Sequence, residues 1–265
     1  MGSGVKIWTP ENNQAADAVP LVLINGLGAN HLHWGRFPGL LDRTVIAVDV
    51  VRNGDKGSMK LFANNLFEVA DTLEHDLFDL GGQSWGGFAA QSAALRDQRR
   101  INKLVLIGTG PGMLCVPPSL RAVAAMRSPK RSLASAGSIF GGEIGQLLQH
   151  RREDLSIDEL GNVKSIETMM AREIDPEKYQ LQMEAVKQCA HHIMTLTGLL
   201  TPTLILVGQK DPIARPMNSR VMNCLIPNSQ LHIEDKVGHD IVYSRAQGCA
   251  HIVDSFLGRQ PKHTK

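Results

Sequence analysis

The sequence has few cysteines, and they stand far apart. Four occur among 265 residues, none of them in a C-x-x-C pair. Zinc sites built from thiolates use such local pairs, so we expect no zinc site here, and no other metal. Dispersed thiols that stay reduced are typical of a cytoplasmic protein.

Long apolar runs are also missing. No stretch approaches the roughly 20 residues that a helix needs to cross a bilayer. The first ten residues lack the continuous apolar core of a secretory signal. We therefore expect no transmembrane segment and a cytoplasmic location.

An excess of charge of either sign is absent as well. The chain carries 28 Lys and Arg against 26 Asp and Glu, a formal net charge of +2. Nucleic-acid binding would want a concentrated basic face, so no nucleic-acid partner is expected. Hydrophobic residues make up 43% and charged residues 20%, which is ordinary for a globular protein with a substantial core.

Short apolar runs alternate with segments of helical periodicity. Asp79 interrupts one of the runs, and an apolar stripe at helical spacing runs from Phe62 to Leu73. Alternating strands and helices predict a doubly wound, mostly parallel sheet. The expected strands are 21–24, 45–50, 77–81, 104–107 and 204–207, with an outer strand at 231–233 and an antiparallel one at 5–8.

The alternation breaks after the strand at about 103–108. From 113 to 199 there are amphipathic stretches and Gly, Pro and Ser punctuation but no clear strand. We interpret this region as a helical cap or lid inserted over the sheet. Because both its ends join the sheet, we expect one domain, 1–265.

The strongest motif is Gly82-Gln-Ser84-Trp-Gly86, a G-x-S-x-G box. It follows an expected strand and precedes a segment rich in small residues, which is the strand–turn–helix context of the nucleophile in the α/β-hydrolase fold. There a serine is held in strained geometry while the glycines let neighbouring segments approach. The alternative is a Gly-rich turn that contains a serine by chance. We predict Ser84 as nucleophile.

A serine hydroxyl needs a base, and the base needs an acid to orient it. In this fold the chain order is Ser, acid, His. Asp211 follows the strand at 204–207, and His239 follows the one at 231–233. We predict both in these roles, although Asp211 could be a turn former before Pro212. Asp240 is the competing acid, but a sequence neighbour rarely points at the same ring.

The loop Asn25-Gly-Leu27-Gly-Ala29 ends the first expected parallel strand. The fold supplies an oxyanion donor there and another just after the nucleophile, so we assign the hole to the backbone N–H groups of Leu27 and Trp85. A dinucleotide fingerprint fails because residue 31 is His where a third Gly is needed. No cofactor is expected, and we expect His31 and His33 to be solvated or to form a wall rather than to bind metal.

Two weaker patterns occur in the sequence. Ser244-Arg-Ala-Gln247 has the form of a helix capping box. The expected cap is rich in methionine, which suits a flexible acyl-chain pocket but is also a common core filler. These methionines are Met113, Met126, Met169, Met170, Met183 and Met194.

Several segments resemble the intracellular poly(3-hydroxyalkanoate) depolymerases that act on medium-chain-length polyester. The similarity runs from about residue 20 to residue 257. The resemblance implies a lipase-like triad matching Ser84, Asp211 and His239, a helical cap, and a cytoplasmic enzyme on storage granules. The matching stretches are Ile24-Asn-Gly-Leu-Gly-Ala-Asn30, Ser84-Trp-Gly-Gly87, Lys103-Leu-Val-Leu106, Ser128-Pro-Lys-Arg131 and Ile226-Pro-Asn-Ser-Gln-Leu-His-Ile233.

The chain departs from its wider relatives after Asp49, where Pro-Gly-x-Gly-x-Ser is replaced, and the cap between Leu133 and Met194 matches less well. Both places lie where substrate is chosen. The predicted function is hydrolysis of a hydrophobic polyester through an acyl-enzyme, without a cofactor. The alternatives are a general carboxylesterase or lactonase acting on small esters and a non-catalytic ligand receptor with a hydrolase fold.

Overall fold

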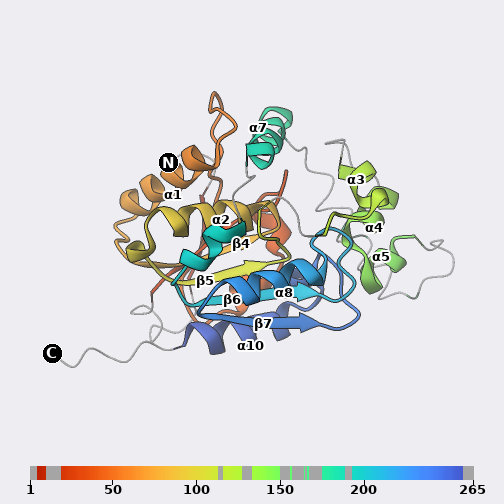
Figure 1. The fold of residues 1–265 in the computed structure, drawn as a ribbon. Coiled ribbons are helices and arrows are strands. Elements are labelled where there is room, and N and C mark those ends of the chain that lie inside the picture. Colours follow the sequence, from red (N-terminus) through yellow and green to blue (C-terminus); the bar gives the residue numbers. More distant parts are fainter. Residues whose placement is uncertain are drawn as a thin grey trace.

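The fold is built around one seven-stranded sheet, seen in a computed structural model (Figure 1). The structure describes residues 5–9, 19–112, 116–126, 133–149, 156, 164, 166, 175–188 and 193–258. The strand order is β1-β3-β2-β4-β5-β6-β7, with β1 antiparallel to β3 and every other pair parallel. The strands are β1 (Val5–Trp8), β2 (Leu21–Ile24), β3 (Val45–Val48), β4 (Phe78–Gln83), β5 (Ile101–Ile107), β6 (Thr203–Gly208) and β7 (Ser229–Glu234).

The strand predictions are confirmed, with small shifts at the ends. All residues of β2, β3 and β6 are buried, because helices cover both faces of the sheet. Along β2 the side chains alternate, so that Leu21 and Leu23 pack in one core cluster while Val22 and Ile24 pack in the other. β7 is only half-buried, as expected of the outer strand.

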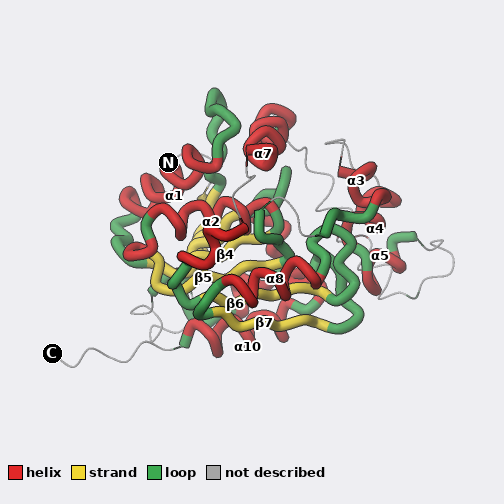
Figure 2. Tube along the Cα trace, viewed as in Figure 1, coloured by secondary structure: helices red, strands yellow, loops and turns green. Residues whose placement is uncertain are grey.

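Helices lie on both sides of the sheet (Figure 2). α1 and α2 pack together and share the cluster with Val22 and Ile24, whereas α10 packs on the opposite face. The helices are α1 (Met59–Thr72), α2 (Trp85–Arg96), α3 (Leu120–Met126), α4 (Leu133–Phe140), α5 (Gly142–Leu147), α7 (Pro176–Gln188), α8 (Pro216–Leu225), α9 (Ile241–Ser244) and α10 (Ala246–Leu257), with short 3-10 turns at His31–Trp34, Phe37–Leu40, Gln98–Arg100 and Ile193–Gly198.

The chain between β5 and β6, here called the inserted segment, has helices and no strand among its described residues. It contributes α3, α4, α5 and α7. Figure 1 shows α3, α4 and α5 grouped beyond one end of the sheet and α7 above α2. α7 meets the end of α3, where the Tyr179 hydroxyl donates to the carbonyl of Met126. A small apolar cluster that includes Ala136 and Leu148 joins α4 to α5, and α3 packs on α4.

One local prediction is wrong. The pattern at 244–247 is not a capping box, because Ser244 ends α9 and Arg245 is the N-cap of α10. The Ser244 hydroxyl donates instead to the carbonyl of Asp240, four residues earlier, at 3.3 Å. Because this hydroxyl bonds back to the preceding turn, it does not cap the helix that follows.

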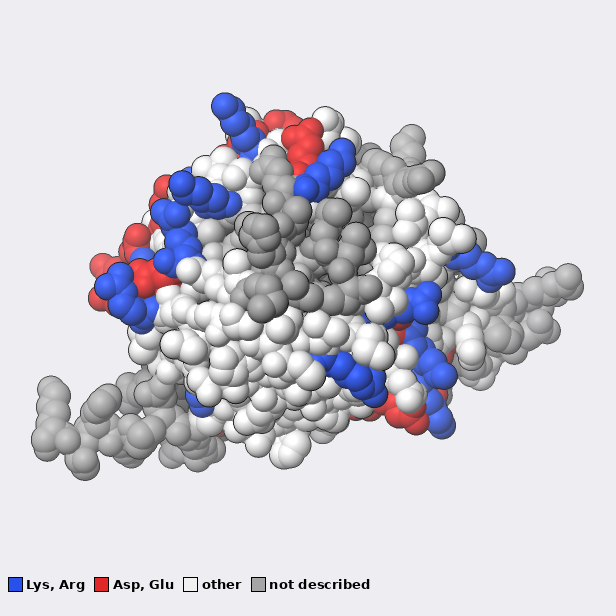
Figure 3. Space-filling model, in the orientation of Figure 1, with Lys and Arg blue, Asp and Glu red and all other residues white. Residues whose placement is uncertain are grey.

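In the described part of the chain, no helix combines the length and apolarity required to cross a bilayer. Figure 3 shows basic and acidic side chains interspersed along the periphery of the face that it draws.

Candidate active site

Ser84 occupies the sharp turn between β4 and α2. It has φ +54°, one of the few non-glycine residues with a positive φ among those described. A side chain at Gly82 would come within 2.2 Å of the Gly86 carbonyl oxygen, and one at Gly86 within 2.1 Å of the Ile24 carbonyl oxygen. Both glycines of the G-x-S-x-G box are therefore required for close backbone approach, and together they hold Ser84 at the carboxyl edge of the sheet.

The side chain of Asp211 is anchored on one oxygen and contacts histidine with the other. Its Oδ1 accepts the backbone N–H groups of Ile213 and Ala214, each at 2.8 Å. Its Oδ2 lies 2.7 Å from Nδ1 of His239. Because a carboxylate only accepts, this contact requires the proton on Nδ1, and in a neutral ring of that tautomer Nε2 is the acceptor atom.

Backbone contacts place the loop of His239 beside the serine turn. β6 and β7 are parallel neighbours, so the segments that follow them leave the sheet at the same edge. Gln83, the residue before the serine, donates its side-chain amide to the His239 carbonyl at 3.2 Å. The N–H of His239 donates to the carbonyl of Phe140 at 2.6 Å. The inserted segment thus takes part in holding this loop.

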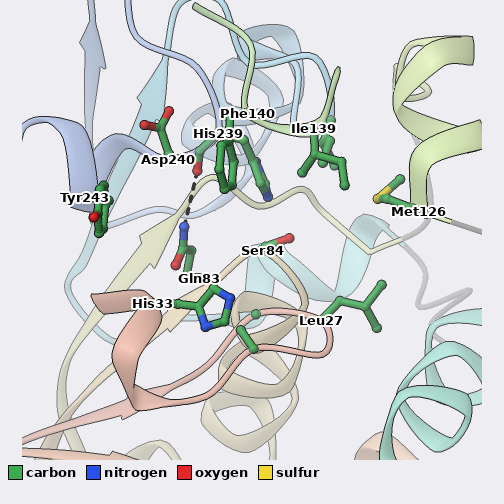
Figure 4. A pocket seen from close by; sticks show the side chains of 13 residues that line it. Leu27, His33, Gln83, Ser84, Met126, Ile139, Phe140, His239, Asp240 and Tyr243 are labelled. Carbon is green, nitrogen blue, oxygen red and sulfur yellow. Dashed lines mark hydrogen bonds between the residues drawn. The ribbon is translucent and has the colours of Figure 1, made fainter. Parts of the chain in front are cut away.

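Asp240 has a different environment from Asp211. It is the N-cap residue of α9, and Figure 4 shows its carboxyl group turned away from Ser84. Burial raises its pKa to about 6. The carboxylate that meets the histidine Nδ1 is that of Asp211, not that of its sequence neighbour.

A pocket opens over Ser84 and His239 (Figure 4). The residues that line it are mostly apolar, and three of these residues come from the inserted segment: Met126, Ile139 and Phe140. The lining residues are Gly26, Leu27, Ala29, His33, Gln83, Ser84, Met126, Ile139, Phe140, Ile213, His239, Asp240 and Tyr243.

Of the methionines noted in the sequence, Met126 lines this pocket. Met113, Met169 and Met170 lie outside the described residues, as does the side chain of Met194.

The loop after β2 carries the first candidate oxyanion donor. Ala29 donates its N–H to the carbonyl of Gly26 at 3.0 Å, which closes a turn around Leu27 and Gly28. The N–H of Gly28 is engaged by Oε1 of Gln182 at 2.7 Å. Leu27 lines the pocket and remains our candidate from this loop.

The second candidate, Trp85, begins α2 directly after the serine. Its indole ring is buried against Phe62, with ring centroids 5.5 Å apart, and its Nε1 donates to the Gln182 carbonyl at 2.9 Å. Sequence reasoning missed Gln182, because a glutamine in a polar helical stretch carries no motif that distinguishes it.

The histidine pair noted in the sequence is divided between two environments. The ring of His31 packs edge-on against Trp8, with centroids 6.3 Å apart. The ring of His33 lines the pocket, and its Nδ1 accepts the N–H of Asn30 at 3.2 Å. Within the described ranges, no group of three or more His, Cys, Asp or Glu residues is placed to hold a metal ion.

Comparison with known proteins matches residues 19–246 to the model of the alpha/beta hydrolase fold family. The chain is 32% identical to a poly(3-hydroxyalkanoate) depolymerase of Ectopseudomonas oleovorans, over 91% of this chain and 85% of that protein. It is 27% identical to a 2-hydroxy-6-oxononadienedioate/2-hydroxy-6-oxononatrienedioate hydrolase of Cupriavidus pinatubonensis, over 93% and 89%.

Among solved structures, a meta-cleavage product hydrolase from Pseudomonas fluorescens superimposes with a TM-score of 0.73 at 21% identity, covering 95% of this chain and 93% of that one. At that identity the likeness is one of fold. The family match spans most of the chain and the sheet has the same architecture, so the chain belongs to the alpha/beta hydrolase fold family.

Proposed function

We propose that this protein is a serine ester hydrolase that works through an acyl-enzyme. The observation that carries the proposal is the serine at the strained turn, which shares a pocket with a histidine whose Nδ1 meets a buried carboxylate at 2.7 Å. A neutral imidazole held in this tautomer accepts the hydroxyl proton of Ser84 through Nε2.

In the proposed reaction, Oγ of Ser84 attacks the ester carbonyl while His239 takes its proton. The N–H groups of Leu27 and Trp85 stabilise the oxyanion of the tetrahedral intermediate. The C–O bond to the alcohol then breaks, and His239 returns the proton to the leaving oxygen. Water repeats the steps on the acyl-enzyme and regenerates Ser84.

We further propose that the substrate is a medium-chain-length polyhydroxyalkanoate, cleaved in the cytoplasm at a storage-granule surface. The 32% identity to a polyester depolymerase supports this substrate class. Leu27, Met126, Ile139, Phe140 and Ile213 give the pocket an apolar wall suited to an alkyl side chain.

A second candidate is hydrolysis of a 2-hydroxy-6-oxo dienedioate, which the 27% identity to a dienedioate hydrolase favours. A dioate carries two carboxylates at neutral pH, and carboxylates are usually bound by Arg or Lys. Neither residue type is among the described residues that line the pocket. The uncharged ester is therefore the better supported substrate.

The test compares the native protein with Ser84→Ala on a latex of medium-chain polyester, on p-nitrophenyl butyrate and octanoate, and on a dienedioate. We expect hydrolysis of the latex and the octanoate, and loss of about 10⁶ in kcat when the nucleophile is removed. A loss under about tenfold would refute the role of Ser84. Turnover of butyrate alone would favour a small-ester hydrolase, turnover of the dienedioate alone the second candidate, and absence of turnover a ligand receptor.

A further inference from the structure

Gln182 of α7 contacts both segments that carry the candidate oxyanion donors, the loop after β2 and the start of α2. Its side-chain Oε1 accepts the N–H of Gly28 at 2.7 Å, and its backbone carbonyl accepts the indole N–H of Trp85 at 2.9 Å. The residue is 6% exposed. We propose that Gln182 is a positioning residue for the oxyanion hole, so that the hole is complete only while α7 is docked. This inference rests on the proposed ester hydrolysis.

The first contact fixes the orientation of a peptide plane next to Leu27. The turn closed by Ala29 and Gly26 has Gly28 at φ +61°, the left-handed conformation that a type II turn requires at its third residue. The N–H that Gln182 accepts belongs to the rigid Leu27–Gly28 peptide in the middle of this turn. Holding that plane limits the rotation of Leu27, whose own N–H is the donor. A displacement of about 1 Å in a catalytic group can cost about 10² in rate.

The second contact fixes the residue after the nucleophile. The Trp85 ring lies between Phe62, with centroids 5.5 Å apart, and the carbonyl of Gln182. It is 2% exposed, so the ring has little room to move. Because Trp85 is the first residue of α2, an anchored ring also anchors the backbone N–H at the helix start.

α7 is itself held against the loop that follows β3. Lys178 pairs with Asp49 at 2.7 Å, and Glu177 accepts the N–H of Gly54 at 3.0 Å. A side chain at Gly57 would come within 2.8 Å of the Leu181 carbonyl oxygen, so loop and helix backbone lie in close contact. These contacts hold α7, and with it Gln182, against the loop after β3, and α7 also meets the end of α3, where the Tyr179 hydroxyl donates to the carbonyl of Met126.

The helix offers a matched control. Gln180 stands two residues earlier, on the exposed side, and bonds Glu184 of the same helix at 3.1 Å. The variants are therefore Gln182→Met, which keeps the length but removes the acceptor, Gln182→Asn, which shortens the reach, Gln182→Glu, which retains an acceptor oxygen, and Gln180→Met. Each is measured for kcat and KM on p-nitrophenyl octanoate and for the Kd of 1-octaneboronic acid, whose tetrahedral adduct places an oxygen in the hole.

We expect Gln182→Met and Gln182→Asn to lower kcat tenfold to a hundredfold, a fraction of the roughly 10²–10³ lost when a donor is removed outright. KM should change little, and boronate binding should weaken by a similar factor. Gln182→Glu should retain most of the native kcat and most of the boronate affinity. Gln180→Met should match the native protein in both quantities. If Gln182→Met fails to fold, the comparison of Gln182→Asn with Gln182→Glu decides.

Unchanged kcat in the Gln182 variants, or a rise in KM alone, would overturn the inference. So would an equal loss in Gln182→Glu, because the acceptor would then not be the reason for the effect. Failure of the proposed function is distinguishable, since the native protein would then neither turn over the ester nor bind the boronate.

Discussion

The two ends of the central strands each hold a buried carboxylate with a cationic or titratable partner. At the amino end, Asp79 of β4 pairs with Arg43 at 3.0 Å. At the carboxyl end, Asp211 after β6 pairs with His239 at 2.7 Å. In both cases the two side chains are almost completely buried. Burial and ion pairing therefore do not distinguish the candidate active site from a structural pair.

The partners make the difference. Arg43 is permanently charged, and its guanidinium also donates to Asp254 and to the carbonyls of Val19 and Gly258. His239 belongs to a residue type that can act as a base, and it lines the pocket with Ser84. A buried pair becomes a candidate for chemistry where one member can change its protonation state and reach a cavity.

The largest effect on activity is expected at Asp211, the buried carboxylate at the carboxyl end of the sheet. In Asp211→Asn, Oδ1 can still accept the N–H groups of Ile213 and Ala214, so the fold should survive. The new amide N–H, however, would donate to Nδ1 of His239 and move the ring proton to Nε2, where a base is needed. We expect kcat to fall about 10⁴-fold, measured on p-nitrophenyl octanoate, with little change in melting temperature. Activity within tenfold of the native value would show that Asp211 does not orient the base.

The opposite outcome is expected at the amino end of the sheet. Arg43→Met removes the cation and leaves Asp79 buried without it, which should lower the free energy of unfolding by about 3–5 kcal/mol, measured by urea denaturation. The kcat of the folded enzyme should not change. Arg43→Met combined with Asp79→Leu should recover much of the stability, because no buried charge remains. A loss of activity in the folded Arg43→Met enzyme would break the distinction between the two ends.

A smaller effect is expected at Asp240, which adjoins His239 and is the N-cap residue of α9. Burial raises its pKa from 3.8 to about 6. The folded state therefore holds the proton more tightly than the unfolded state, and stability declines as pH rises from about 4 to about 6. The decline due to this group is at most about 3 kcal/mol. Asp79, with a pKa also raised to about 6 by burial, contributes in the same direction.

Asp240→Asn imitates the protonated form and should reduce this decline. Urea denaturation of the native protein and the variant at pH 4.5 and pH 7 gives the difference, with Asp79 contributing equally to both. Identical pH dependence in the two proteins would mean that the Asp240 carboxyl does not titrate in this range.

Much of the fold could be predicted because its strands are short, continuous apolar runs. Leu21–Ile24 was predicted with its observed bounds, since a strand buried on both faces has no polar position to obscure it. Asp79 weakened the prediction for β4, and the structure gives the reason that it is tolerated: Arg43, from a loop far away in the sequence, reaches it. A contact of that kind leaves no local pattern.

The candidate site also has residues that the sequence reveals and one that only the structure reveals. Ser84, Asp211 and His239 stand in recognisable positions at strand ends, so the sequence located them, and their catalytic roles stay a prediction. Gln182 was missed because its role depends on how α7 packs on loops 25 to 29 and 84 to 85, which no spacing reveals. The predicted capping box at Ser244 is wrong because the Ser244 hydroxyl bonds to the Asp240 carbonyl at the start of α9, a short helix that the sequence pattern did not reveal.

The central claim, that Ser84 is a nucleophile activated by His239, is tested most directly by a fluorophosphonate that reacts covalently with activated serines. The native protein, Ser84→Ala and His239→Ala are treated alike, and the site of the adduct is located by peptide mass spectrometry. The account predicts a single adduct on Ser84, no adduct in Ser84→Ala and a rate lowered at least a thousandfold in His239→Ala, as expected when the base that activates a serine is lost. An adduct on another residue, or an unmodified native protein that still hydrolyses octanoate in the presence of the probe, would contradict it.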